Sequence, residues 1–200
     1  KAPLKLPERT ETRRVGRTLP VQEDLVLIAP YDGIGGARRS LEILGIRPVA
    51  YISIETDEDC AAVVAKSWPD VKALSKAVAE VTDEEIGAIL RSYPKLKRGI
   101  IVGGPPCQGL TKLNRGRKGF DDPRTSEILV FRDLVAKLQA IAPSIKWHMM
   151  MENVGTMVAA DCDRISSELL SGLVQPEPPS WRDLPVASKY FDVPPESDMS

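Results

Sequence analysis

The chain has 200 residues, 42% of them hydrophobic, so it suits one domain with a real core, or a part of a larger protein. No apolar run reaches the roughly 18 residues of a membrane span, and the polar, basic first residues show no secretory signal, so we expect no membrane association. Three cysteines without a CxxC pair and one histidine argue against a zinc site or a disulfide framework, so we expect no metal and a reducing compartment.

The net charge of −1 conceals two basic segments. Residues 1–20 carry a charge of +4 and residues 111–124 a charge of +3, which leaves about −8 for the remainder. Basic charge gathered in a tail and a loop could meet phosphate, although charge alone favours a solvated tail and loop.

The chain begins with a segment that has no apolar period, residues 1–22, which predicts a basic arm or linker. The continuous apolar run at 25–29 is typical of a buried parallel strand. The glycine turn YDGIGG, residues 31–36, follows it. A helix is expected over 37–44, with Gly45 as its C-cap.

The second strand is expected over 51–55. A helix over 58–67 should follow it, with Asp57 as N-cap and Pro69 beyond its end. The run from Thr82 to Glu85 forms a capping box, which predicts a helix to about Arg91.

A third strand is expected over 99–104, followed by a polar loop and a helix over 126–140 that Pro143 stops. The run at 147–152 indicates a further strand, and another helix should begin near residues 161–163.

Strands that alternate with helices predict an α/β fold, a doubly wound and mostly parallel sheet covered on both faces. We expect this core to span 23–172 and a Pro-rich C-terminal segment to occupy 173–200. In such sheets ligands bind beyond the carboxyl ends of the strands. The segments expected at that edge are Asp32–Gly36, Glu55, Pro105–Gln108 and Glu152.

The glycine turn and Glu55 suit an adenosine-containing cofactor. Glycines let the backbone approach a ligand closely, and the following helix offers free N–H groups. An acid at the end of the second strand, such as Glu55, can accept from ribose hydroxyls. A tight turn with an unrelated surface glutamate remains the alternative.

Cys107 follows Pro105 and Pro106, which restrict the backbone and remove two N–H donors. Nearby positive charge favours the reactive thiolate, and Lys112, Arg115, Arg117 and Lys118 lie just downstream. The other cysteines, Cys60 and Cys162, are expected to be buried packing residues on helices.

His148 lies within the apolar run WHMMM and is expected to be a core strand residue, so Cys–His hydrolase chemistry finds little support. Glu152 is the other polar group at this edge. A carboxyl held near a thiolate would have a raised pKa and could stay protonated, ready to donate to a ring nitrogen of a bound base.

In this order and spacing, these pieces resemble the cytosine-C5 DNA methyltransferase family over residues 25–171. YDGIGG resembles the cofactor-binding glycine motif, and Glu55 matches the ribose-binding acid. Pro106-Cys107-Gln108 matches the catalytic Pro-Cys motif and Glu152-Asn153-Val154 the Glu-Asn-Val motif. Residues 114–119, Asn-Arg-Gly-Arg-Lys-Gly, look closest to the animal de novo DNA methyltransferases.

The resemblance implies a Rossmann-like methyltransferase fold, S-adenosylmethionine as cofactor with S-adenosylhomocysteine as product, and DNA as partner. The cofactor-binding residues would be Tyr31, Asp32, Gly33, Ile34, Gly35, Gly36, Glu55 and Pro106. The catalytic residues would be Cys107, Gln108, Glu152 and Asn153, with the Cys107 thiolate adding to C6 of a flipped cytosine, Glu152 bonding N3 and Asn153 bracing the Cys107 loop. The DNA-contacting residues would be Asn114, Arg115, Arg117 and Lys118.

Three departures from the family pattern matter. The Asp that contacts the adenine amino group is absent near Lys76-Ala77-Val78, and Asp70 comes too early. The Arg-x-Arg motif has only a remnant at 186–195, with Ala187 and Lys189 at the two positions, and lysine does not replace arginine in bidentate contacts. Nothing resembles the target-recognition region or the last cofactor motif.

Two other functions stay open: a catalytically inactive methyltransferase-like scaffold or regulatory partner, and an RNA cytosine-C5 methyltransferase. A homo- or hetero-oligomer with a related methyltransferase is also left open. We expect a nuclear location if the source is eukaryotic and a cytoplasmic one otherwise.

Overall fold

The structure, a computed structural model, describes residues 19–106, 126–153 and 159–170. The strands within these ranges are β1 (Val21–Pro30), β2 (Arg47–Ile54), β3 (Lys72–Leu74), β4 (Arg98–Gly103) and β5 (Lys146–Met151). The helices are α1 (Gly36–Ile43), α2 (Glu58–Ser67), α3 (Asp83–Arg91), α4 (Ser126–Ile141) and α5 (Ala159–Leu170), with a 3₁₀ turn η1 (Val78–Glu80).

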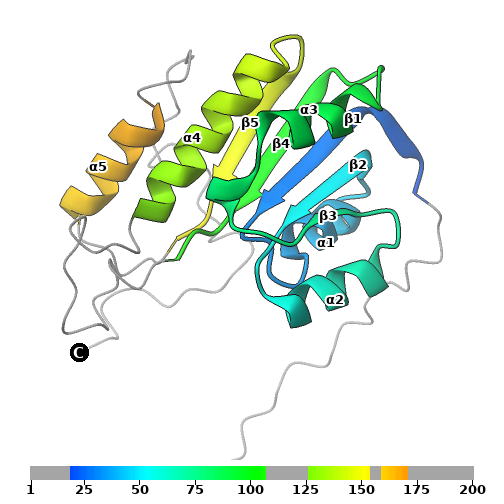
Figure 1. Cartoon of the computed structure of the whole chain (residues 1–200), viewed down its shortest axis with the longest axis horizontal. Coiled ribbons are helices and arrows are strands. Elements are labelled where there is room, and N and C mark those ends of the chain that lie inside the picture. Colours follow the sequence, from blue (N-terminus) through cyan, green and yellow to red (C-terminus); the bar gives the residue numbers. More distant parts are fainter. Residues whose placement is uncertain (1–18, 107–125, 154–158, 171–200) are drawn as a thin grey trace, which may run out of the picture.

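The strands form one sheet in the order β3-β2-β1-β4-β5. Every pair is parallel, so all the arrowheads in Figure 1 point the same way. The predicted α/β parallel sheet is therefore confirmed. The order also fixes which loops meet, because the segments that follow β2, β1, β4 and β5 leave the sheet side by side.

Helices cover the sheet on both faces, as Figure 1 shows. α3, α4 and α5 pack on one face and enclose the larger core cluster, which includes Val26, Ile28, Ile52, Ile86, Ile101, Phe131, Leu138 and Ile165. α1 and α2 pack on the other face around a smaller cluster of Leu27, Ala29, Leu41, Tyr51 and Val64. The central strand β1 is buried from both sides, which explains its continuous apolar sequence.

Local signals set the helix ends as predicted. Asp57 caps α2 by accepting the Cys60 N–H at 2.9 Å. Thr82 and Glu85 form the capping box of α3. Gly45, at φ 78°, ends α1 in the left-handed conformation that favours glycine.

Some boundaries differ from the predictions. β1 begins at Val21, inside the segment expected to be an arm, because Val21 and Gln22 pair with Arg47 and Pro48 of β2. A register shift then separates Gln22 from Val26. The short strand β3 was not predicted, and α5 begins at Ala159, slightly before the expected start.

The prediction that His148 is a core residue is wrong, because its side chain is exposed. β5 alternates along its length: Trp147, Met149 and Met151 pack against the larger core, whereas Lys146, His148 and Met150 face outward. Within the described ranges no strand lies beyond β5, and α1 and α2 cover the β1–β2 side of that outer face. Met150 therefore stays 58% exposed.

Among the helices that the structure describes, none is both long enough and apolar enough to cross a membrane.

Candidate active site

The carboxyl edge of the sheet gathers the residues that the sequence singled out. Residues 31–36 follow β1, Glu55 follows β2, 104–106 follow β4, and Glu152 follows β5. In the sheet order, these segments lie next to one another along a single edge. Five parallel strands thus bring together residues that are up to 121 positions apart, from 31 to 152.

The turn after β1 is built on left-handed backbone. Tyr31, Gly33 and Gly35 have φ values of 54°, 55° and 85°. The Gly35 N–H donates to the Asp32 carbonyl at 3.1 Å, which closes the turn before α1 starts. A Cβ added at Gly33 or Gly36 would meet nothing within 4 Å. The turn therefore presents open backbone on these two residues, which is what a bound ligand needs.

Glu55 is held against this turn. One carboxylate oxygen, Oε2, accepts the Gly33 N–H at 2.8 Å. The other, Oε1, accepts the N–H groups of Thr56 at 2.8 Å and Asp57 at 2.9 Å. Since an ionised carboxylate offers about four acceptor positions, one remains on Oε2 for a hydroxyl donor. The expected ribose-binding acid is thus oriented toward the turn by backbone hydrogen bonds.

Asp32 forms a second polar group beside Glu55. Its Oδ2 atom accepts a short hydrogen bond from the buried Tyr51 hydroxyl, whereas its Oδ1 atom is buried and makes no hydrogen bond within the described part of the chain. Burial raises the pKa of Asp32 above its ordinary value. The nearby Ser53 and Tyr51 hydroxyls oppose this rise in pKa, and the negative charge of Glu55 adds to it.

Tyr51 is fixed by its neighbours on the α1–α2 face. Its ring meets the Trp68 ring edge-on, with centroids 5.8 Å apart and an interplanar angle of 88°. The Arg38 guanidinium lies 5.8 Å from the Tyr51 centroid. Trp68 is itself anchored by donating from Nε1 to Glu42 at 2.8 Å.

Trp68 also lies on the glycine turn. A Cβ at Gly35 would stand 2.2 Å from the Trp68 ring, so only glycine fits there. The aromatic pair thus connects α2 and β2 to the turn that follows β1.

Tyr31 and Ile34, both predicted cofactor contacts, differ in their surroundings. Tyr31 donates its hydroxyl to the Glu127 carboxylate at 2.8 Å, and its ring packs against the larger core, so its side chain is engaged with α4. Ile34 is 65% exposed, and its apolar side chain is available to a ligand.

Glu152 lies beside the segment that leads to Cys107. Its backbone N–H extends the β4–β5 ladder by donating to the Gly103 carbonyl at 2.9 Å. Its carboxylate covers Gly104, where an added Cβ would be 3.1 Å from Oε2. Pro105 is buried and Pro106 exposed, and Asn153, next to Glu152, is half-buried. The acid expected to act with Cys107 is therefore near the chain three residues before it.

Several predicted site residues lie outside the described residues: Cys107, Gln108, Asn114, Arg115, Arg117 and Lys118. The same holds for the remnant of the Arg-x-Arg motif at 186–195. Cys60 is half-buried rather than fully buried, and burial together with Asp57 raises the pKa of its thiol, which disfavours the reactive thiolate.

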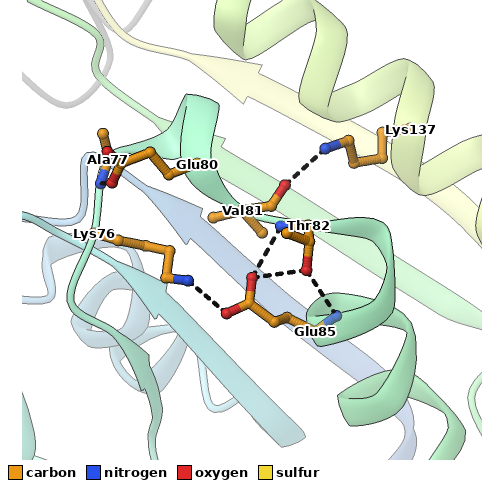
Figure 2. Close-up of polar contacts among 7 residues, drawn as sticks. All are labelled: Lys76, Ala77, Glu80, Val81, Thr82, Glu85 and Lys137. Carbon is orange, nitrogen blue, oxygen red and sulfur yellow. Dashed lines mark hydrogen bonds and ion pairs between the residues drawn. The ribbon is translucent and has the colours of Figure 1, made fainter.

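The segment after β3, where the expected adenine-contacting Asp is absent, holds Lys76. Figure 2 shows the Lys76 ammonium bound to the Glu85 carboxylate, which also accepts from the Thr82 backbone and hydroxyl. From α4, Lys137 donates to the Val81 carbonyl at 2.7 Å. Asp70, the other acid considered, faces Arg47 at 3.6 Å. The ammonium group in this segment is thus anchored to α3 through Glu85.

The residues at this edge fit an adenosine cofactor with an amino-acid end. They offer open glycine backbone, an oriented Glu55 with a free acceptor position, and a buried Asp32 oxygen without a hydrogen-bond partner among the described residues. No cluster of metal-ligating side chains occurs in the part of the chain that the structure describes. The sequence did not predict that Tyr51, Trp68 and Arg38 belong to the site. The one related signal was the apolar run around Tyr51, which predicted strand β2 but not this contact.

The fold and the edge together define a Rossmann-like α/β domain of the kind found in S-adenosylmethionine-dependent methyltransferases. The family model for C-5 cytosine-specific DNA methylases matches residues 28–175. The chain therefore belongs to that family.

Individual relatives agree with this assignment. The type II methyltransferase M.AquIA of Picosynechococcus is 24% identical over 164 residues, which cover 82% of this chain and 62% of the relative. The tRNA (cytosine(38)-C(5))-methyltransferase of Mus musculus is 29% identical over 133 residues, or 66% of this chain and 29% of the relative. The chain thus spans less than two thirds of either relative.

A solved structure of a prophage-encoded E. coli protein, described as a DNA modification methyltransferase, shares the fold. It has a TM-score of 0.55 and 23% identity, and the match covers 74% of this chain and 37% of the other. The family assignment confirms the resemblance to cytosine-C5 methyltransferases. The expected closeness to animal de novo enzymes stays a prediction.

Proposed function

We propose that this chain carries the catalytic part of a DNA cytosine-C5 methyltransferase, which acts on a cytosine extruded from the duplex. The observation that supports it best is the Glu152 carboxylate over Gly104, beside the strand end that leads to Cys107. The glycine turn and Glu55 lie at the same edge on neighbouring strands. A base and a methyl donor could then meet between β1, β4 and β5.

Each residue would have one task. The Cys107 thiolate forms a bond to C6 of the cytosine, and the displaced electron pair makes C5 nucleophilic while Glu152 hydrogen-bonds N3. When bound, S-adenosylmethionine supplies an electrophilic methyl group. C5 would take that methyl group with release of S-adenosylhomocysteine. Loss of the C5 proton to water would then return the electron pair and break the Cys107–C6 bond. Asn153 would brace the segment that carries Cys107. Gln108 would be the next residue of that catalytic segment.

The bound ligands would contact other parts of the same edge. The turn residues Tyr31–Gly36, with Glu55 and Pro106, would hold the cofactor. The polar residue Asn114 and the basic residues Arg115, Arg117 and Lys118 would contact DNA phosphates, which position a duplex without reading its sequence.

Two kinds of nucleic acid, DNA and RNA, are candidates for the substrate. The family description names DNA, and M.AquIA is a type II methyltransferase. The murine relative acts on tRNA, so an RNA substrate is the second candidate. A DNA substrate would place the protein in the nucleus of a eukaryote or in the cytoplasm of a bacterium.

Covalent trapping tests the proposal. The protein is incubated with labelled S-adenosylmethionine and duplex DNA that contains 5-fluorocytosine. Fluorine replaces the proton that must leave C5, so an adduct cannot resolve. We expect a labelled, denaturant-resistant complex with the wild type and with Cys60→Ser, whose thiol lies on α2, and none with Cys107→Ser.

The outcomes separate the candidates. An adduct with fluorinated tRNA but none with DNA would replace the DNA substrate with RNA. Cofactor binding without any adduct would favour the inactive scaffold, and gel filtration with a related methyltransferase would then show whether the two associate. An adduct that persists in Cys107→Ser would contradict the proposed nucleophile.

A further inference from the structure

We infer that Tyr51 is a positioning residue that aims the Asp32 carboxylate at the ammonium group of the cofactor's amino-acid end. The inference rests on the proposed function, because it assumes that an S-adenosyl amino acid binds at the glycine turn. It assigns Tyr51 a role that the sequence analysis did not foresee.

The two carboxylate oxygens of Asp32 have different surroundings. Oδ2 accepts from the Tyr51 hydroxyl, and the carboxylate is part of the turn that contains the open glycines. Oδ1 is buried and makes no hydrogen bond to the described residues, although the Ser53 hydroxyl is near enough to influence the carboxylate. Because an unpaired buried acceptor is costly, Oδ1 is suited to a donor from a ligand.

Tyr51 is held in place by its neighbours. Only 2% of Tyr51 is exposed, and its ring contacts both the Trp68 ring and the Arg38 guanidinium. Trp68 is fixed in turn by its hydrogen bond to Glu42. The hydroxyl of Tyr51 therefore has a defined position, so its bond to Oδ2 also sets the direction in which Oδ1 points.

The surroundings of Asp32 favour a cationic donor. Glu55 takes the Gly33 N–H and retains a position for a ribose hydroxyl, so Asp32, next to Gly33, is left for the part of the cofactor beyond the ribose. That part carries an ammonium group. Burial and the charge of Glu55 both work against the ionised form of Asp32 and raise its pKa, so a cation offsets this cost where a neutral hydroxyl would not.

Two ligands distinguish this role from a general effect on the site. S-adenosylhomocysteine has adenosine and the amino-acid end, whereas 5′-methylthioadenosine has adenosine without the amino-acid end. Calorimetry would measure the Kd of each for the full chain as wild type, Tyr51→Phe and Asp32→Asn. Tyr93→Phe is the matched control, because it removes the same hydroxyl from a half-buried tyrosine. Tyr93 lies just past the end of α3, away from the glycine turn.

We expect Tyr51→Phe and Asp32→Asn to weaken S-adenosylhomocysteine binding by about tenfold, the scale of one hydrogen bond to a charged group. Binding of 5′-methylthioadenosine should change less than about twofold, the remainder of the site being intact. Tyr93→Phe should change neither Kd.

Other results would overturn the inference. Equal losses for both ligands in Tyr51→Phe would show general damage to the turn. An unchanged Kd for S-adenosylhomocysteine in Tyr51→Phe would remove the positioning role, and the same result in Asp32→Asn would remove the ammonium contact. If the wild type binds neither ligand, the proposed function fails and this inference fails with it.

Discussion

Gly35 is required in the turn for two reasons: its backbone conformation and the absence of a side chain. Its φ of 85° already favours glycine, and the Trp68 ring occupies the place of a Cβ. Gly45 has a similar φ of 78°, but a Cβ there would meet nothing within 4 Å. The two positions therefore separate backbone strain from steric overlap.

We expect Gly45→Ala to lower the free energy of unfolding by about 1–2 kcal/mol, the cost of left-handed backbone for alanine. Gly35→Ala should cost about 2–5 kcal/mol, because overlap with an anchored ring adds about 1–3 kcal/mol. Urea denaturation of both variants measures the difference. Equal losses would mean that Trp68 moves away at little cost.

Residues whose positions follow from local pattern could be predicted, and contacts that depend on packing across the fold could not. Glu55 and Glu152 each end an apolar run, and a parallel sheet brings such ends together whatever the details of packing. The bond from Tyr51 to Asp32 spans 19 positions and depends on how β2 lies beside β1. No periodicity in the sequence predicts this hydrogen bond.

Among the elements, α3 depends most clearly on one side chain. The carboxylate of Glu85 completes the capping box with Thr82 and binds Lys76, which joins the helix to the end of β3 (Figure 2). Its hydrogen bonds to Lys76 and Thr82 lower the pKa of Glu85 from 4.5 to about 2. An acid with a lowered pKa in the folded state stabilises the fold above its unfolded pKa, and this contribution is lost as the pH falls.

The variant Glu85→Gln keeps an acceptor for Thr82 but loses the charge. We expect it to unfold at a lower temperature than the wild type at neutral pH, and the gap to close as the pH falls from about 4.5 to about 2. Thermal unfolding across this range measures it. Glu84→Gln is the control, because Glu84 is 83% exposed and its pair with Arg91 adds little. A gap that stays constant with pH would contradict the charge-based account.

The sequence predicted elements with strong local signals and missed those without them. Helix α2 carries its own cap and ends before a proline, so its bounds were predicted as observed. Strand β3 has three residues, two of them exposed, and such a segment has no alternation to detect. The apolar residues around His148 suggested that β5 is buried on both sides, but the core packs against only one face of this edge strand.

At the scale of the whole molecule, the two faces of the sheet are unequally supported. The face under α3, α4 and α5 holds the larger cluster, and the face under α1 and α2 holds the smaller one. In α2 the buried residue is Val64 alone. Free energy from apolar burial scales with area, so α1 and α2 should open more readily than the opposite layer.

Hydrogen exchange followed by mass spectrometry tests this difference. We expect amides of α1 and α2 to exchange faster than those of α4 and β1, since local opening releases less buried surface. S-adenosylhomocysteine should slow exchange in the turn and α1 and leave α4 nearly unchanged. Uniform protection on both faces would show that the sheet opens only as a unit.

The indole of Trp68 rests on the turn proposed to receive the cofactor, which makes it an internal optical reporter. Its emission responds to the polarity and motion around the ring, so occupancy at Gly33–Gly36 becomes visible without a label. The chain has two other tryptophans: Trp147, which lies over Gly99 at the start of β4 and the far end of the sheet, and Trp181, which lies outside the described residues. Replacing both with Phe leaves Trp68 as the source of the tryptophan emission. Cofactor titrations could then be followed by the fluorescence of Trp68, which needs less protein than calorimetry.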